Sequence, residues 1–107
     1  MSVQLVAFYG EPENKEEFEK NYFEGHLPLA AKMPGLQDVK VVRFEKNLMG
    51  GNPPYYMMAT MTFDSMDALN AAMGSDEGKA AGANVMGFAG KIITMTTAEV
   101  CQVPAAV

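Results

Sequence analysis

The stretch Tyr55-Tyr-Met-Met-Ala-Thr-Met-Thr-Phe63 has the clearest β-strand pattern in the sequence. Side chains alternate between the two faces of a strand, so its residues separate into two sets. Every second residue from Tyr55 is apolar, and the intervening set from Tyr56 is more polar because it includes Thr60 and Thr62. The sequence therefore predicts one sheet face that packs on helices and one that faces a different, partly hydrated space.

Three more strands are expected on either side of this one, at residues 2–9, 36–46 and 91–100, which are rich in β-branched and aromatic residues. The first helix is expected at residues 15–25, with Asn14 as its cap and a looser turn as far as Met33, because Pro28 is disfavoured inside a helix.

A second helical region is expected at residues 66–73 and 76–84, followed by a loop at 85–90 in which Phe88 is the one bulky residue. The resulting order is strand–helix–strand–strand–helix–strand. This order predicts an α+β, ferredoxin-like βαββαβ domain over residues 1–107, with a four-stranded antiparallel sheet and both helices on one face. The uncovered face carries aromatic, Met and Thr residues, which favours a homodimer in which two sheets close on each other.

Composition excludes several classes of protein. The 107 residues suffice for one domain, and 8 Lys+Arg against 13 Asp+Glu give a net charge of −5 without a basic cluster, so a nucleic-acid partner is disfavoured. No uncharged apolar run reaches about 18 residues, so no membrane span is expected. The N-terminus lacks a signal-peptide pattern, and a single cysteine fits a reducing cytoplasm.

The only histidine, His26, provides the main chemical signal. It follows Phe18 by eight residues, Tyr22 by four and Phe23 by three, and these helical spacings place it among aromatic rings on or near one face. Imidazole is the side chain best suited to move a proton near neutral pH. The pattern indicates a small apolar pocket with one acid–base group, and a half-buried structural histidine is the alternative.

The ten methionines also admit two interpretations. Methionine is unbranched and polarizable and fills irregular space. Its abundance is typical of an adaptable core, which is the favoured interpretation, or of a pocket for a variable apolar ligand.

One combination of residues resembles a known family. Tyr9, Pro12, Phe18-x3-Tyr22-x3-His26-x-Pro28-Leu29 and Pro34-Gly35-Leu36 are similar to the EthD family, named for ethyl tert-butyl ether degradation, within the dimeric α+β barrel superfamily. The resemblance implies a homodimer with a pocket between the sheet and the first helix of each subunit. It also implies that His26, Tyr22 and Phe18 line that pocket.

The resemblance leaves the activity open, because the superfamily includes cofactor-independent monooxygenases, cyclases, isomerases and haem-binding enzymes. Members of the family often accompany oxygenase systems in breakdown pathways, which favours a role in catabolism of a small apolar or aromatic compound. One hypothesis is an enzyme, a cofactor-independent oxidoreductase or a lyase or isomerase, with His26 as general acid or base and Tyr22 as the orienting residue.

Two alternatives are non-catalytic binding of a hydrophobic metabolite and a haem protein with His26 as axial ligand. No cofactor and no metal is expected, because a zinc or iron site would need a second histidine or further ligands. Arg43 has a role only if it faces the pocket and not solvent. The candidates for substrate binding are Phe18, Phe23, Tyr9, Arg43, Tyr56, Met58 and Phe88.

Overall fold

The computed structural model describes residues 2–104 and confirms the predicted fold class. Within these residues, a four-stranded antiparallel sheet has the order β2-β3-β1-β4. The strands are β1 (Val3–Tyr9), β2 (Asp38–Arg43), β3 (Met57–Phe63) and β4 (Ile93–Glu99). The expected strand at residues 36–46 is thus shorter at both ends.

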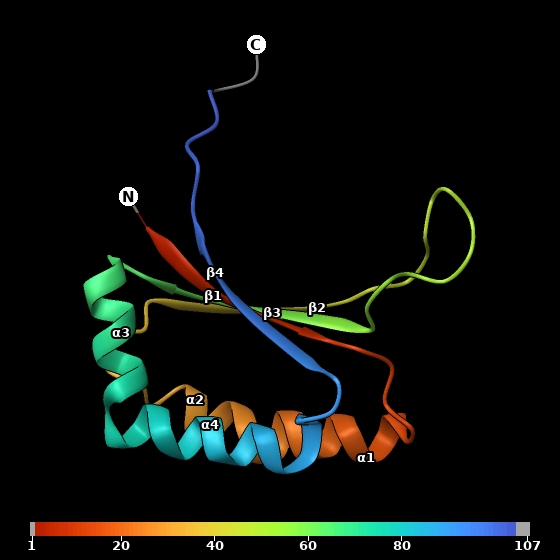
Figure 1. Ribbon diagram of the computed structural model, residues 1–107, viewed down its shortest axis with the longest axis horizontal. Helices are drawn as coiled ribbons and strands as arrows, with labels where there is room; N and C mark the ends of the chain where they lie inside the picture. The colour runs from red at the N-terminus through yellow and green to blue at the C-terminus, as the bar shows by residue number, and fades with distance from the viewer. Residues whose placement is uncertain (1, 105–107) are drawn as a thin grey trace.

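The helices lie on one side of this sheet (Figure 1). They are α1 (Lys15–Lys20), η1 (Asn21–His26), α2 (Leu27–Ala30), α3 (Met66–Gly74) and α4 (Asp76–Ala89). Side-chain oxygens of Asn14, Ser65 and Ser75 accept backbone N–H groups of the first turns of α1, α3 and α4.

The strand register assigns each side chain to a face. Tyr9 pairs with Met57 and Ile93, and these residues pack in the core beneath the sheet. The next row along the strands runs from Val42 through Met58 and Phe8 to Thr94 and lies on the opposite face. We call this opposite side the open face, since Figure 1 shows no helix over it. The apolar and the more polar face expected from residues 57–63 are thus confirmed.

The prediction was wrong for the two tyrosines that precede β3. The Tyr56 N–H donates to the carbonyl of Tyr9, although Tyr9 is paired with Met57. Two consecutive residues opposite one are typical of a β-bulge, which interrupts the alternation of faces. Tyr56 therefore packs on the helix side against Phe18, whereas the Tyr55 ring packs against Phe8 of the open face, with 4.7 Å between ring centroids.

The expected loop at residues 85–90 is also corrected, because α4 continues to Ala89. Glycines at positions 78 and 82 lower the helix propensity of this segment, which favoured an earlier end. The buried side chains of Ala81, Val85 and Ala89 recur along α4 and pack beneath the sheet. Burial of this stripe outweighs intrinsic propensity, as in most helices of globular proteins.

The first helical region contains a π-helical segment, η1, which lies within the helix expected at residues 15–25 and extends one residue beyond it. The looser turn expected as far as Met33 begins as the short α-helix α2. The Leu27 N–H donates to the carbonyl of Tyr22, five residues back. Pro28 has no N–H, and a proline ring collides with the carbonyl four residues before it in a regular α-helix. The turn before Pro28 widens in consequence.

This widening keeps one side of the helix directed at the sheet. Phe18, Tyr22, His26 and Ala30 are buried and follow one another at intervals of four. In an α-helix, four residues overshoot a full turn by about 40°. A π turn, closed by i→i+5 hydrogen bonds, takes more residues per turn and rotates the side chains the other way. Alternation of the two geometries therefore holds all four residues on the same side.

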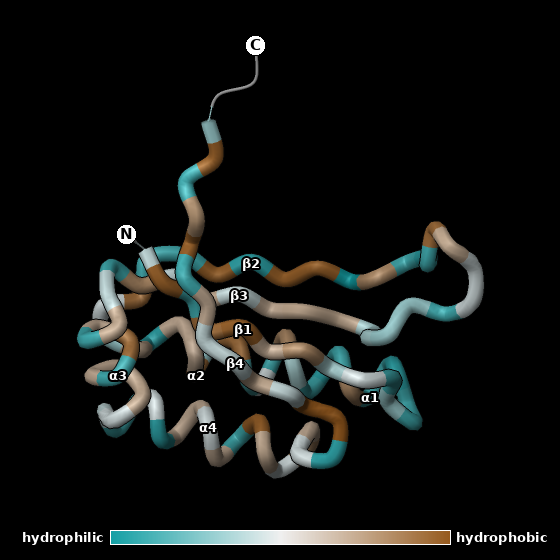
Figure 2. The backbone as a smooth tube through the Cα atoms, turned by 45° about the horizontal axis from the view of Figure 1, so that its top comes forward, coloured by the Kyte–Doolittle hydropathy of each residue, from teal (hydrophilic) through white to brown (hydrophobic). Residues whose placement is uncertain are grey.

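Hydrophobic residues concentrate in the strands, and hydrophilic residues concentrate around α1 (Figure 2). Beneath the sheet, one buried cluster lies around Phe63 and Leu69, and a second, aromatic cluster lies around Tyr9, Phe18 and Tyr22. No helix within residues 2–104 has both the length and the apolar character needed to cross a membrane.

Candidate functional site

His26 lies at the end of η1 beside the aromatic cluster and is only 5% exposed. Its ring lies 5.5 Å from the Tyr22 ring and 6.1 Å from the Phe88 ring, measured between centroids. Its Nδ1 lies 3.2 Å from the side-chain oxygen of Asn84 in α4. Residues from two separate helices thus hold the imidazole in place.

The hydrogen bond to Asn84 decides what the imidazole can do. An amide oxygen only accepts, so this contact is a hydrogen bond in the tautomer that carries its proton on Nδ1, and in that tautomer the neutral ring has a free lone pair on Nε2. Within residues 2–104, every side-chain nitrogen or oxygen that is fully buried has a hydrogen-bond partner. The hydrogen bond of the imidazole is the one at Nδ1, so Nε2, which has no partner, is not fully buried and is reached by solvent. Burial lowers the pKa of His26, and the Asn84 hydrogen bond opposes that effect. Both observations favour a neutral ring that accepts a proton at Nε2.

Two tyrosine hydroxyls lie in the same cluster. The Tyr9 ring packs edge-on against Tyr22 and Phe18, at centroid distances of 5.3 and 5.4 Å. Burial raises the pKa of Tyr22 to about 12 and raises that of Tyr9 further. Both tyrosines are therefore neutral near pH 7 and act as hydrogen-bonding groups, which leaves His26 as the group that titrates near neutrality.

A small apolar cavity, the inner pocket, lies beside His26 between the sheet and the helices. Its volume is about 30 Å³, which is room for a few water molecules. The inner pocket is lined by Leu5, Ala7, Tyr9, His26, Ala30, Met33, Met61, Met73, Gly78, Ala81, Gly82, Val85, Ile93 and Met95. Four methionines, at positions 33, 61, 73 and 95, belong to this lining. They pack in the interior and also border the cavity, so the core and the pocket expected for methionine share the same residues.

A larger open groove of about 730 Å³, the outer groove, lies between the start of α1 and the end of α4. The rings of Phe18 and Phe88 line it, and their centroids are 5.7 Å apart. The Phe88 ring also contacts His26, so it stands between the outer groove and the imidazole. The outer groove is lined by Glu11, Pro12, Glu13, Asn14, Glu17, Phe18, Asn21, Met86, Gly87, Phe88, Ala89, Gly90, Lys91 and Ile92.

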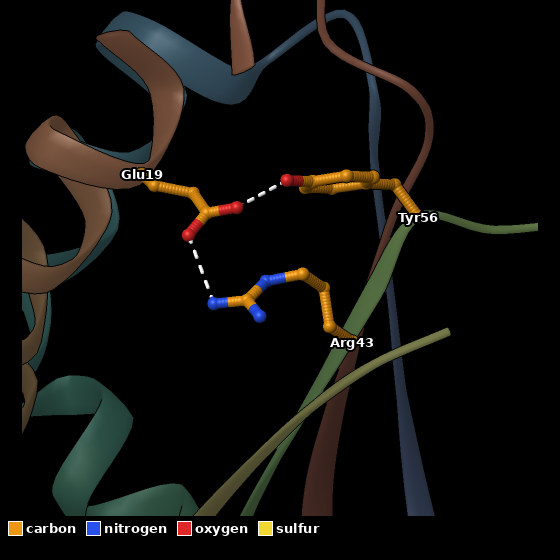
Figure 3. Close-up of polar contacts among 3 residues, drawn as sticks. All are labelled: Glu19, Arg43 and Tyr56. Atoms are coloured by element: carbon orange, nitrogen blue, oxygen red, sulfur yellow. Dashed lines mark hydrogen bonds and ion pairs between the residues drawn. The ribbon is translucent and has the colours of Figure 1, made fainter. Parts of the chain in front are cut away.

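Two further candidates, Arg43 and Tyr56, meet at the edge of the sheet (Figure 3). The Arg43 guanidinium lies 3.0 Å from one carboxylate oxygen of Glu19, and the Tyr56 hydroxyl donates to the other. These hydrogen bonds lower the pKa of Glu19, the bond to Tyr56 contributing most. Arg43 and Tyr56 therefore tie α1 to the sheet edge, and Phe18 and Tyr22 lie between Tyr56 and His26.

The remaining candidates lie apart from His26. Phe23 is 39% exposed, and its ring packs edge-on against that of Tyr22. Met58 lies on the open face, on the other side of the sheet from the inner pocket. The sequence reasoning missed Asn84 and Glu19. Asn84 is the one polar residue in an otherwise apolar series with Ala81, Val85 and Phe88, and that spacing is a signal that could have identified it.

The comparison with known proteins agrees with the fold. A model of the EthD domain family matches residues 10–92. The chain belongs to the EthD family. An EthD family protein from Bacillus halodurans, known from its crystal structure, is 44% identical and superposes with a TM-score of 0.90, covering 94% of this chain and 100% of that chain.

Other relatives of this EthD chain are more distant. A Rhodococcus erythropolis protein, described as an uncharacterized 11.0 kDa protein in the thcB-thcC intergenic region, is 31% identical over 86% of this chain and 88% of its own. SnoaB from Streptomyces nogalater, a cofactor-independent oxygenase, shares the fold at 15% identity, with a TM-score of 0.70 and coverage of 95% of both chains. Other structures of this fold, 15–19% identical, are described as dimeric ferredoxin-like proteins.

Metal and haem binding find little support in the geometry. Within residues 2–104, no group of three or more His, Cys, Asp or Glu side chains is placed to hold a metal ion. A haem is far larger than the inner pocket, so it does not fit beside His26 in this structure.

Proposed function

We propose that this EthD chain binds a small apolar or aromatic molecule in the inner pocket, where His26 acts as general base and then as general acid. The observation that carries the proposal is a buried imidazole on an apolar cavity, with Nδ1 held by Asn84 and Nε2 free. Proton transfer by a positioned imidazole typically accelerates a reaction about 10²- to 10⁴-fold. The reaction classes that fit are elimination, isomerisation and cofactor-independent oxidation with dioxygen as the electron acceptor, each of which can begin with removal of a proton.

Ligand binding requires the inner pocket to enlarge, because its volume of about 30 Å³ is smaller than any aromatic ring. Met33, Met61, Met73 and Met95 can yield space by rotation about their flexible side chains. Rotation of the Phe88 ring would join the inner pocket to the outer groove, which supplies a route from solvent.

In the proposed reaction, Nε2 of His26 removes a proton from a carbon or oxygen of the bound molecule. The electron pair stays on the substrate, and the imidazolium later returns the proton to the product or to water. Tyr22, the orienting residue expected from the sequence, packs against the His26 ring and is not among the residues that line the inner pocket. Tyr9 lines the inner pocket and is neutral near pH 7, so its hydroxyl is the candidate donor to the negative charge that develops on the substrate.

A second candidate function is binding without catalysis, in which the chain sequesters or carries a hydrophobic metabolite. One observation favours binding without catalysis. The pKa values of the neighbouring Tyr9 and Tyr22 are raised, so neither tyrosine can exchange a proton near neutral pH as a partner of His26. We place either activity in a homodimer that takes part in breakdown of apolar compounds. The open face and the dimeric description of proteins with this fold support the dimer.

Ligand binding can be tested through the methionine methyl groups. Titration with toluene should shift the methyl NMR signals of Met33, Met61, Met73 and Met95, which line the inner pocket. The internal control is Met49, which is 94% exposed in the loop between β2 and β3. Equal shifts at Met49 and the pocket methionines, or none at all, would contradict the proposed binding site.

Catalysis can be tested with 5-nitrobenzisoxazole, a small aromatic probe whose ring opens when a base removes its C3 proton and the N–O bond breaks. We expect the wild-type protein to accelerate this reaction and His26→Gln to lose at least about 10²-fold of the acceleration. The control is Phe23→Leu, which changes an exposed ring outside the pocket and should keep the wild-type rate. Binding of toluene together with equal rates in wild type and His26→Gln would reject catalysis by His26 and support the second candidate function.

A further inference from the structure

Asn84 is a polar side chain on the inward side of α4. It lies well inside the helix, and the residues around it on this side, Ala81, Val85 and Ala89, are buried. Asparagine is unfavourable in a helix interior because its side chain competes for backbone hydrogen bonds. Here its side-chain oxygen is directed away from the α4 backbone toward His26, at 3.2 Å from Nδ1.

Contacts on either side of the ring restrict its orientation. Phe88 lies one helical turn after Asn84 and meets the imidazole edge-on, with 62° between the ring planes. The Tyr22 ring packs against it from η1, one turn before His26. The ring is therefore restrained by one hydrogen bond and two aromatic contacts, and only the hydrogen bond distinguishes the two ring nitrogens.

We propose that Asn84 is a positioning residue that fixes His26 in the Nδ1–H tautomer and so reserves Nε2 for a ligand in the inner pocket. This inference rests on the function proposed above, because a fixed tautomer matters only if Nε2 exchanges a proton. An amide suits this role better than a carboxylate. Its oxygen accepts a hydrogen bond from Nδ1–H in both the neutral and the protonated ring, and it carries no charge that would hold the imidazole protonated.

The charge state of the surroundings supports a neutral acceptor. The titratable groups that face His26 from the packed elements are the hydroxyls of Tyr9 and Tyr22, and burial raises the pKa of both. Within residues 2–104, no salt bridge involves His26, because the ion pairs present join Lys15 to Glu11 and Arg43 to Glu19. The tautomer is therefore set by the Asn84 oxygen and not by a nearby charge.

The chain has one histidine, so the tautomer can be observed directly. Imidazole-¹⁵N labelling gives two nitrogen signals, both from His26, and their shifts identify the protonated nitrogen. The wild-type protein should show Nδ1–H when the ring is neutral. Asn84→Leu, which has a similar size and no acceptor, should shift the population toward Nε2–H and slow ring opening of 5-nitrobenzisoxazole by about tenfold or more.

Two variants separate positioning from folding. Asn84→Asp keeps an acceptor, so it should retain the Nδ1–H form while raising the pKa of His26 and moving the pH–rate profile upward. Asn70→Leu makes the same substitution as Asn84→Leu at an exposed site in α3 and should leave the tautomer unchanged. A wild-type Nε2–H tautomer, or an Nδ1–H population equal in wild type and Asn84→Leu, would overturn the inference.

The tautomer measurement needs no substrate, so the two proposals can fail separately. An Asn84-dependent tautomer with no rate acceleration would leave the positioning contact in place and reject catalysis. A rate that depends on His26 and not on Asn84 would keep the proposed function and reject the role of Asn84.

Discussion

At the scale of single residues, the proposed chemistry depends on a histidine kept neutral by its surroundings. Burial lowers the pKa of His26 below its ordinary value of 6.5. The four-residue spacing of Phe18, Tyr22 and His26 allowed the sequence to identify these neighbours, because residues four apart meet on one side of a helix. The sequence could not identify the Asn84 contact, since it joins residues 58 positions apart.

The lowered pKa of His26 predicts a pH dependence of stability. The unfolded chain binds a proton below about pH 6.5, whereas the folded chain binds it only below its lower pKa. The stabilising contribution is therefore complete above pH 6.5 and declines as the pH falls toward the folded pKa. Urea unfolding of wild type and His26→Gln should show a steeper decline for the wild type in that window, by up to about 1.4 kcal/mol per pH unit. Parallel curves for the two proteins would contradict a lowered pKa.

At the scale of elements, local signals predicted most of the fold. The alternation at residues 57–63 and the cap at Asn14 depend on neighbouring residues, and both were confirmed. The errors arose where tertiary contacts decide the outcome. Residues 85–89 are helical because Val85 and Ala89 are buried beneath the sheet, and Tyr56 turns to the helix side because of the bulge opposite Tyr9. Arg43 and Tyr56 have Glu19 as a partner, which no local pattern reveals.

The junction of α3 and α4 gives a test of helix packing. A Cβ at Gly78 would collide with the backbone carbonyl of Ala72, whereas a Cβ at Gly87 would meet no atom within 4 Å. We expect Gly78→Ala to lower the free energy of unfolding by about 1–3 kcal/mol through this clash. Gly87→Ala, in the same helix, should raise it by about 0.5–1 kcal/mol through helix propensity. Equal effects of the two substitutions in urea unfolding would show that the helices do not approach so closely.

At the scale of the whole molecule, the open face is the main uncovered surface. The register aligns Val42, Met58 and Phe8 in one apolar row across it. Figure 1 shows the loop between β2 and β3 and the C-terminal segment extending on the same side, away from the helices. At the tip of that loop Leu48 and Met49 are almost fully exposed. These features fit the proposed contact with a second copy of the chain.

The proposed dimer predicts different effects for the same substitution on opposite sides of the molecule. Met58→Lys places an unpaired charge at the centre of the apolar row and should convert a dimer to a monomer at micromolar concentration in analytical ultracentrifugation. Met86→Lys adds the same charge on the exposed side of α4 and should leave the dimer intact. A monomeric wild-type protein, or a Met58→Lys variant that stays dimeric, would contradict this interface.

The π-helical turn accommodates one residue more than a continuous α-helix would need in the same segment. Gly25 lies in that turn, and a side chain there would touch nothing within 4 Å, so its own substitution is sterically free. Its deletion would shorten the spacing of the four buried residues around it to four, three and four, which a continuous α-helix keeps within about 60° of one another. A chain that kept all its residues but lost the wide turn would instead spread the same four side chains over about 120°. The extra residue and the wide turn therefore compensate for each other, and only the loss of one without the other would scatter the rings and the imidazole.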